Sequence, residues 1–544
     1  MSFTLFRLIA PLRPLLGRLG TLLTPPESEP RDYPFAPTDV AQLHRLTAGD
    51  AADQLDDSTW RDLLLDRYSE RLALDTSIFG RQVLYRRLRA GADDAEAARR
   101  RARIETLTAD PVRLAGLQRV LRALRMAEAE VAELLFDPHW RAPLAPGWLA
   151  WRFLLPLALV ASIAAALLLS PLGWGALALV LYWLVLPQMR YRERMEEWKR
   201  LLPPLQMMLR VCSLLDGSGH PLAGDFAGRG AQAGRIGRAL VRSPLVEQVP
   251  GAKEYPDWFM LANVRHYFKG TALVAGQRGF LRACYWLCAD LDADVALARH
   301  LLVTPSWCWA GRGAPRALDI EEGVHPLVEG ADALSISLDG KGAFVSGQNG
   351  VGKSTLLRML GLNLATARAF GFCYARHAVL PAVPVVASMQ NEDSLLGGQS
   401  LYIAELARAR ELLAAARGPG PVVCLIDEIF RGTNHEESVS AAAAVLDELA
   451  RHALVVVSSH NLVLGPLLAH RLAPWRVERG GDGGLRLAPG VLGRTNGIAL
   501  LASHGFDAAL QERAGKVAGW LAGQRHTGTG ADLLDEAPRR AAAP

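Results

Sequence analysis

A glycine-rich loop in the second half of the chain ends in a lysine and two hydroxyl residues. The loop comprises Gly347, Gln348, Asn349, Gly350, Val351, Gly352, Lys353, Ser354 and Thr355, and it separates a strand-like run at 343–346 from a helical run at 356–369. In such a loop the glycines let backbone N–H groups curl around phosphates, and the helix N-terminus adds partial positive charge. We expect Lys353 to reach the β and γ oxygens of a nucleotide and Ser354 to hold Mg²⁺.

Two acidic residues follow the next conspicuous strand-like run. The apolar segment 421–426 (PVVCLI) ends directly in Asp427 and Glu428. In a doubly wound α/β fold, a carboxylate at the carboxyl end of a buried strand holds Mg²⁺, and a neighbouring carboxylate can polarise the attacking water. We therefore expect Asp427 to orient the metal ion and Glu428 to act as the base.

Two further polar residues gain meaning from their order along the chain. His460 ends the strand-like run 455–459, where it could sense or hold the γ-phosphate or the attacking water. Ser400 follows Gly397, Gly398 and Gln399 and precedes a helical run. Two interpretations of Ser400 stay open, because it can be a plain N-cap or can present its hydroxyl to a nucleotide bound by a second subunit.

An uncharged apolar stretch lies before the middle of the chain. From Phe153 to Met189 the sequence contains no Asp, Glu, Lys or Arg, and 170–173 (SPLG) provides a turn. About 20 apolar residues cross a bilayer, so the stretch is long enough for two short spans. Flanking arginines predict that both ends face the cytoplasm; they are Arg141 and Arg152 before the stretch and Arg190, Arg192 and Arg194 after it. The alternative is a buried helical hairpin in a soluble core.

Composition and the pattern of apolar runs divide the chain into segments. The chain has 544 residues, of which 50% are hydrophobic and 21% charged, so it is not disordered throughout. Its net charge of +5 permits nucleic acid or anionic lipid as a partner without requiring either. From about residue 316, short strand-like runs alternate with helices, which is typical of a parallel α/β sheet. The predicted segments are a leader and linker at 1–37, a helical region at 38–146, a transmembrane hairpin at 147–189, a second helical region at 190–315, an α/β P-loop domain at 316–523 and a tail at 524–544.

Taken together, the motifs resemble the ATPase domain of the MutS mismatch-repair family, a branch of the ABC-type ATPases. The P-loop, the segment 397–400 (GGQS), the segment 427–433 (DEIFRGT) and His460 occur in the order of that family. Weaker similarity covers 55–89, which resembles the start of the family's helical core, and 487–514, which resembles its closing helical segment. The stronger resemblance covers roughly 320 to 523.

The resemblance implies a specific fold class and activity. The expected fold is a MutS-type α/β P-loop ATPase domain preceded by a mostly α-helical core region with a transmembrane helical hairpin. The implied protein is a homodimer that binds ATP and Mg²⁺, with composite sites completed by Ser400 in trans, and whose nucleotide state drives a DNA clamp. None of the fifteen phenylalanines is followed two places on by Glu, so the Phe-x-Glu wedge of the mismatch-sensing domain is missing, and residues 1–50 leave no room for that domain. We expect a shortened, membrane-tethered MutS-like ATPase.

Two other functions share most of the nucleotide site. The first is a membrane-anchored, ATP-dependent switch that acts on a protein partner and binds no DNA. The second is an ABC-transporter half, suggested by 396–399 (LGGQ), although Leu396 stands where the transporter signature has a serine. One hairpin is little membrane for a substrate pathway, which disfavours the transporter.

Overall fold

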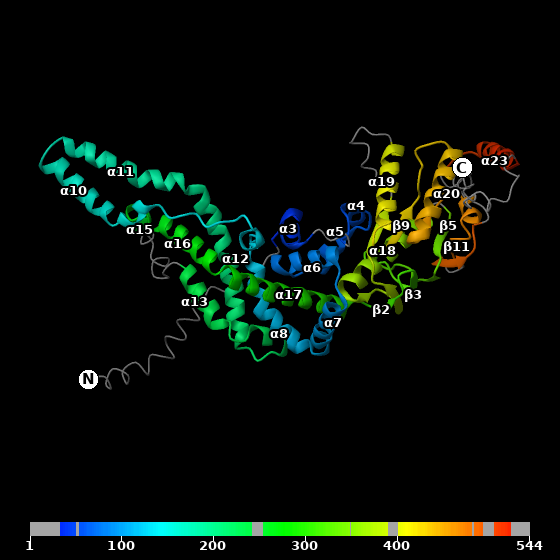
Figure 1. The fold of residues 1–544 in the computed structure, drawn as a ribbon, viewed down its shortest axis with the longest axis horizontal. Helices are drawn as coiled ribbons and strands as arrows, with labels where there is room; N and C mark the ends of the chain where they lie inside the picture. Colours follow the sequence, from blue (N-terminus) through cyan, green and yellow to red (C-terminus); the bar gives the residue numbers. More distant parts are fainter. Residues whose placement is uncertain are drawn as a thin grey trace, which may run out of the picture. The chain divides into compact units, whose positions relative to one another are not determined.

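The computed structural model describes residues 33–49, 54–241, 254–348, 350–389, 401–480, 483–492 and 505–523. Internal contacts divide the chain into two units. The hairpin unit contains 116–131 and 139–288, and the sheet unit contains 37–115, 132–138 and the chain from 289 onward. Figure 1 shows the helices and strands of both units. The predicted leader (1–37) and tail (524–544) lie almost entirely outside the described residues.

The hairpin unit is helical throughout its described part. Its elements are η2 (Arg122–Met126), η3 (Gly147–Trp151), α10 (Leu154–Leu168), α11 (Leu172–Arg190), α12 (Arg192–Asp216), η4 (Pro221–Phe226), α13 (Gly230–Leu240), α15 (Glu254–Phe259), α16 (Ala262–Gly276) and the first part of α17 (Arg278–Val303). Helices α10 and α11 run antiparallel as a hairpin, as the sequence predicts (Figure 1). Gly173 makes the close turn possible, because a Cβ there would lie 2.2 Å from the backbone nitrogen of Ala166.

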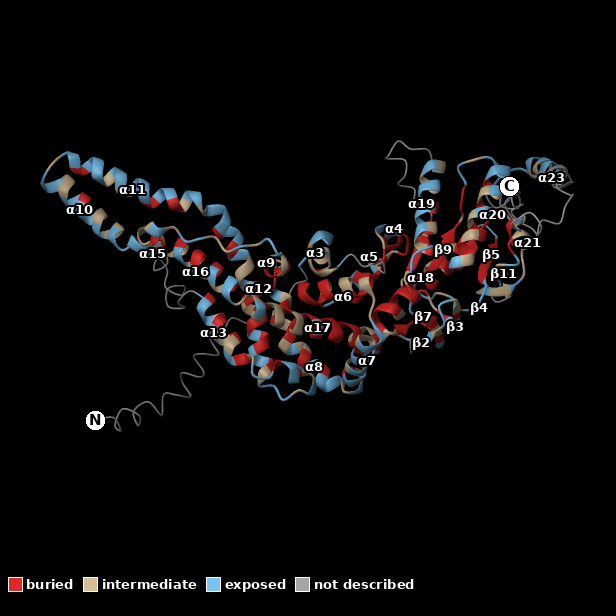
Figure 2. Cartoon of the chain, viewed as in Figure 1, coloured by how far each residue is buried: buried red, intermediate tan, exposed pale blue. Residues whose placement is uncertain are grey.

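The two hairpin helices expose most of their apolar side chains. Figure 2 shows α10 and α11 largely in the colour of exposed residues, and Leu157, Val160 and Leu179 are 66%, 67% and 59% exposed. Among the described residues, α11 alone is long and apolar enough to qualify as a membrane span, and α10 is a shorter apolar helix. At 1.5 Å per residue, α10 is about 22 Å long and α11 about 28 Å, against a hydrocarbon core of about 30 Å. The apolar side chains of both helices are thus largely exposed, and only α11 has the length and composition of a span among the described residues.

The sheet unit begins with a group of helices, of which α6 and α7 form ion pairs with the second half of α17. The group comprises α3 (Pro37–Thr47), α4 (Asp57–Asp62), α5 (Leu65–Leu72), α6 (Ile78–Ala90), α7 (Asp94–Ala109), the first part of α8 (Pro111–Leu121) and α9 (Ala132–Phe136). Buried polar contacts fix α6 against α17. The guanidinium of Arg87 pairs with Asp294 at 2.7 Å and with Asp290 at 2.8 Å, and Asp292 accepts from the backbone N–H of Ser77 at 3.0 Å.

The rest of the sheet unit is α/β. Its six-stranded sheet has the order β12-β11-β5-β10-β9-β8, in which all neighbours are parallel except β12 and β11. The strands of this sheet are β5 (Gly342–Gly347), β8 (Val385–Ser388), β9 (Val423–Asp427), β10 (Leu454–Ser458), β11 (Leu472–Arg479) and β12 (Leu485–Pro489). The strand-like runs at 343–346, 421–426 and 455–459 correspond to β5, β9 and β10, so the predicted parallel sheet is confirmed.

Four-stranded and two-stranded sheets, which the sequence did not predict, accompany this core. The first has the order β2-β7-β3-β4, and the second pairs β1 with β6. Their strands are β1 (Cys308–Trp309), β2 (Gly311–Gly313), β3 (Ala317–Gly323), β4 (Leu334–Asp339), β6 (Phe372–Cys373) and β7 (His377–Pro381). The remaining helices are α18 (Lys353–Phe370), α19 (Leu401–Ala416), α20 (His435–His452), α21 (Leu464–Leu467) and α23 (Ala508–Gly523).

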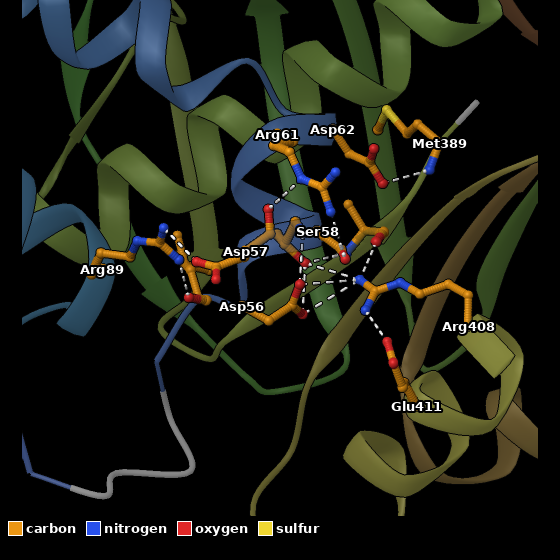
Figure 3. A network of polar contacts seen from close by, with 12 residues as sticks. Asp56, Asp57, Ser58, Arg61, Asp62, Arg89, Met389, Arg408 and Glu411 are labelled. Atoms are coloured by element: carbon orange, nitrogen blue, oxygen red, sulfur yellow. Dashed lines mark hydrogen bonds and ion pairs between the residues drawn. The ribbon is translucent and has the colours of Figure 1, made fainter. Parts of the chain in front are cut away.

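Helix α4 covers the free edge of strand β8 with side chains. The backbone N–H of Ala387 donates to Thr59 Oγ1 at 2.9 Å, and that of Met389 donates to Asp62 Oδ2 at 2.8 Å. Arg408 of α19 donates to the carbonyl of Ala387 and reaches Asp56 at 3.3 Å (Figure 3). Unpaired edge groups would otherwise be open to other strands, so these polar contacts terminate the sheet.

Candidate nucleotide site

The P-loop begins at the carboxyl end of β5 and ends at the N-terminus of α18, as predicted. Gly350 and Gly352 have φ values of 71° and 106°, in the left-handed region that favours glycine. A Cβ at Gly347 would lie 2.8 Å from a side-chain carbon of Val351. The glycines therefore serve the tight loop, while Asn349 lies outside the described residues.

Lys353 places its ammonium group inside this loop. Its side chain is largely buried, and Nζ donates to the carbonyls of Gly347 and Gln348 at 3.1 Å each. Burial lowers the pKa of Lys353, and the carboxylates of Glu428 and Asp427 act in the opposite direction. A positive group is thus held at the position where the sequence predicts phosphate oxygens. Ser354 follows it in the first turn of α18.

The two predicted carboxylates stand at the carboxyl end of β9, beside β10. Asp427 is 5% exposed, and its Oδ1 accepts a short hydrogen bond from the hydroxyl of Ser458. The backbone N–H of Glu428 donates to the carbonyl of Ser458 at 3.0 Å. Strand pairing brings these groups together, because Ser458 is the register partner of Asp427. Ser458 is a site residue that the sequence analysis did not single out, although it lies two residues before His460.

His460 lies between Lys353 and the carboxylate of Glu428. Its Nε2 contacts Glu428 Oε1, and its Nδ1 lies 3.5 Å from Lys353 Nζ. Because an ammonium group can only donate, Nδ1 accepts from Lys353, and Nε2 carries the proton that it donates to Glu428. The structure thus places His460 against Glu428, in the site where the sequence predicts it.

The electrostatics of Glu428 favour the ionised carboxylate. Burial raises the pKa of Glu428, but the hydrogen bond from His460 and the charges of Arg431 and Lys353 outweigh it, so the pKa lies below its usual value. Arg431 Nε is 3.3 Å from Glu428 Oε2. An ionised carboxylate accepts hydrogen bonds at both oxygens, as a group that orients water must.

The structure brings together most of the predicted site residues. Lys353, Asp427, Glu428 and His460 meet at the carboxyl ends of β5, β9 and β10, with Ser354 next along α18. Ser400 and residues 397–399 lie outside the described residues, so its two interpretations stay open. The sequence analysis assigns no role to Arg431, which lies in the loop after β9, or to Glu405 of α19, which contacts this loop. Nothing near Glu405 in the sequence indicates its contacts, because they lie 26 and 27 residues away.

The fold and this site define an α/β P-loop domain with paired carboxylates after β9, one strand removed from β5 in the sheet. Residues 343–473 match the family model of MutS domain V. The chain is 29% identical to the DNA mismatch repair protein MutS of Salinibacter ruber over 293 residues, 49% of this chain and 31% of that protein. It is 28% identical to MutS of Thermus thermophilus (45% and 31%) and 32% identical to MutS of Synechococcus sp. (43% and 27%).

Residues 343–473 are thus similar to MutS domain V, and similarity to MutS proteins extends over about half of the chain. The chain spans about a third of the length of the curated relatives it matches, or less.

Proposed function

We propose that the chain is a MutS-like ATPase that hydrolyses ATP with Mg²⁺ to drive a dimeric DNA-binding clamp in mismatch repair or related DNA maintenance, tethered to a membrane by the α10–α11 hairpin. The contact chain Lys353–His460–Glu428, with Asp427 beside it, carries the ATPase part. The names of the relatives, DNA mismatch repair proteins, support the DNA part. The exposed apolar hairpin supports the tether.

The described residues fit a magnesium nucleotide. The loop from Gly347 to Gly352 has the glycine conformations that expose backbone N–H groups, and Lys353 supplies a buried positive charge to phosphate oxygens. Asp427 is a buried carboxylate on the same edge of the sheet, and Ser354 carries a hydroxyl in the first turn of α18. Oxygen ligands of this kind suit Mg²⁺. When bound, the ion would neutralise charge on the phosphates.

The protein groups divide the work of hydrolysis. Lys353 binds the β and γ oxygens, and the N-terminus of α18 adds its dipole. Glu428 orients the attacking water and accepts its proton at a carboxylate oxygen. His460 holds Oε1 of Glu428 through its Nε2–H, which leaves Oε2 toward Arg431. Ser400 would complete the site of a second subunit.

The best test of the ATPase and DNA parts is turnover by the detergent-solubilised full chain. ATP hydrolysis is measured without DNA and with perfect, mismatched and branched duplexes, with Glu428→Gln as the blank and Lys353→Ala as the variant that fails to bind ATP. We expect Glu428→Gln to retain ATP and lose turnover. Stimulation of the wild type by any DNA supports the clamp, and the ranking of duplexes shows which structure it prefers.

Two outcomes would contradict the proposal. Normal hydrolysis by Glu428→Gln would show that Glu428 is not the base. Turnover that is indifferent to every DNA would favour the membrane-anchored switch acting on a protein partner, which uses the same ATP-site residues. The transporter-type alternative would instead require turnover that depends on a solute in a vesicle.

The membrane tether has a separate test that keeps the fold in place. An arginine at the centre of a spanning helix costs about 2.5–3.5 kcal/mol, so Val160→Arg with Leu179→Arg should release the chain from vesicles in a flotation assay. Both side chains are exposed, so the substitutions need not disturb packing. Val112→Arg, at a residue of α8 that is 82% exposed, is the matched control. Flotation of the double variant like the wild type would refute the tether, and with it the proposed cytoplasmic location of the ATPase domain beside a two-span hairpin.

A further inference from the structure

The loop that carries Glu428 has an unusual backbone. Glu428 and Phe430 have φ values of 61° and 57°, although neither is glycine. Residues with a side chain rarely adopt the left-handed region, so such a loop persists only where contacts hold it. One of these contacts is the short hydrogen bond from the Ser438 hydroxyl to the carbonyl of Phe430.

Helix α19 provides the contacts that hold the far side of this loop. Glu405 Oε2 accepts from the backbone N–H of Arg431 at 2.9 Å and from that of Gly432 at 3.2 Å. The loop packs directly on the first turn of α19, because a Cβ at Gly432 would lie 2.6 Å from the backbone nitrogen of Tyr402. The backbone after the base is therefore fixed by one carboxylate and one close approach.

The side chain of Arg431 lies between two carboxylates. Its Nε is 3.3 Å from Glu428 Oε2 and 3.8 Å from Glu405 Oε1. The side chains of Glu428 and Glu405 are 9% and 15% exposed, so both act in a partly desolvated setting where charge contacts are stronger than in water. Glu405 thus accepts from the backbone N–H of Arg431 and shares the guanidinium of Arg431 with Glu428.

We propose that Glu405 is a positioning residue for ATP hydrolysis, which sets the orientation of Glu428 through Arg431. The proposal rests on the proposed function, since it assumes that Glu428 is the base. Without Glu405, the backbone N–H groups of Arg431 and Gly432 lose their acceptor and the guanidinium has one carboxylate instead of two. Arg431, the partner of Glu428 Oε2, is then no longer held in place by α19.

The test compares steady-state ATP hydrolysis by the full chain and by Glu405→Ala, Glu405→Gln and Arg431→Ala, with Glu428→Gln as the blank. Misplacement of a catalytic group by about 1 Å can cost about 100-fold, so we expect kcat of Glu405→Ala to fall about 10- to 100-fold. Its Kd for a non-hydrolysable ATP analogue and its thermal midpoint should stay near the wild-type values. Glu405→Gln keeps one oxygen for the two backbone N–H groups and should retain more activity than Glu405→Ala.

A double-mutant cycle separates this role from a merely structural one. If Glu405 acts through Arg431, the loss in kcat from Glu405→Ala should be much smaller in the Arg431→Ala background. Glu411→Gln is the matched control, because Glu411 lies on the same helix and pairs with Arg408 instead. Losses that multiply, or a wild-type kcat in Glu405→Ala, would overturn the proposal alone. Wild-type turnover no greater than that of Glu428→Gln would overturn the proposed function, and this proposal with it.

Discussion

Replacing Thr59 with valine would test how helix α4 protects the edge of the sheet. The Thr59 side chain is fully buried, and its hydroxyl accepts from the N–H of Ala387 at 2.9 Å and donates to Asp56 Oδ2 at 3.0 Å. Valine has nearly the same shape but no hydroxyl. Thr59→Val therefore leaves a buried N–H on β8 without its acceptor, while the packing of α4 stays close to that of the wild type.

The main cost comes from the unpaired N–H of Ala387, although Asp56 and Arg408 also lose their hydrogen bonds to the hydroxyl and keep other partners. Leaving a buried N–H unsatisfied costs about 1–3 kcal/mol, which corresponds to an increase of roughly 5- to 150-fold in the local opening equilibrium of β8. The cost falls on one strand edge, because on its other side β8 keeps its pairing with β9. The effect should thus be confined to the segment that ends at residue 389.

Hydrogen exchange followed by mass spectrometry measures this local opening in the full chain. Peptides that cover 383–389 should exchange faster in Thr59→Val by that factor, whereas peptides from β5 should not change. Thr59→Ser keeps the hydroxyl and loses one methyl group, about 0.8 kcal/mol, so it is the matched control. Equal acceleration in Thr59→Val and Thr59→Ser, or none in either, would refute the hydrogen bond as the source of protection.

Two further substitutions test other contacts of the sheet unit. Gly432→Ala forces a carbon against the backbone of Tyr402 and should lower kcat about 10- to 100-fold, measured against Gly420→Ala, where a Cβ has open space. Burial raises the pKa of Asp447, but hydrogen bonds from one histidine and two arginines outweigh it, so the pKa lies below its usual value. The stabilisation that ionised Asp447 gives to the folded chain is therefore present above the usual carboxyl pKa. It is lost as the pH falls through the lower pKa that Asp447 has in the folded state. Asp447→Asn should lower the thermal midpoint at pH 7 by about 2–4 °C, the effect of ~1 kcal/mol in a domain of this size. The difference in thermal midpoint between wild type and variant should narrow near pH 3. Equal differences at both pH values would contradict this role of Asp447.

The sequence was sufficient to predict the part of the site that parallel strands assemble. Apolar runs ending in Asp427 and Ser458–Ser459 are buried strands, and the carboxyl ends of parallel strands meet at one edge. For the same reason, the P-loop and His460 could be placed near these carboxylates from the order of motifs. The helical hairpin was equally predictable, because an uncharged apolar stretch with a central turn has few other solutions.

Contacts between distant segments could not be predicted. Thr59 and Asp62 have the pattern of a short N-capped helix, and nothing near them in the sequence indicates that their side chains pair with β8, 327 and 328 residues away. Glu405 likewise occupies an ordinary position in a helix. The four-stranded sheet escaped prediction because β3 and β4 alternate buried and exposed residues over short runs, a weaker signal than the continuous apolar strands of the core.

The polar contacts of α4 also constrain how the sheet can move. Asp62 accepts from the N–H of Met389, its backbone carbonyl accepts from Arg358 of α18 at 3.0 Å, and burial raises the pKa of its carboxyl group. About two turns farther along α18, the hydroxyl of Thr366 donates to that of Tyr68 in α5 at 3.0 Å. Hydrogen bonds weaken steeply when their geometry changes, whereas apolar surfaces can slide. A nucleotide-dependent shift of α18 or β8 must therefore carry α4 and α5 with it, or break buried hydrogen bonds at about 1–3 kcal/mol each. We therefore expect α4 and α5 to follow any shift of α18 or β8.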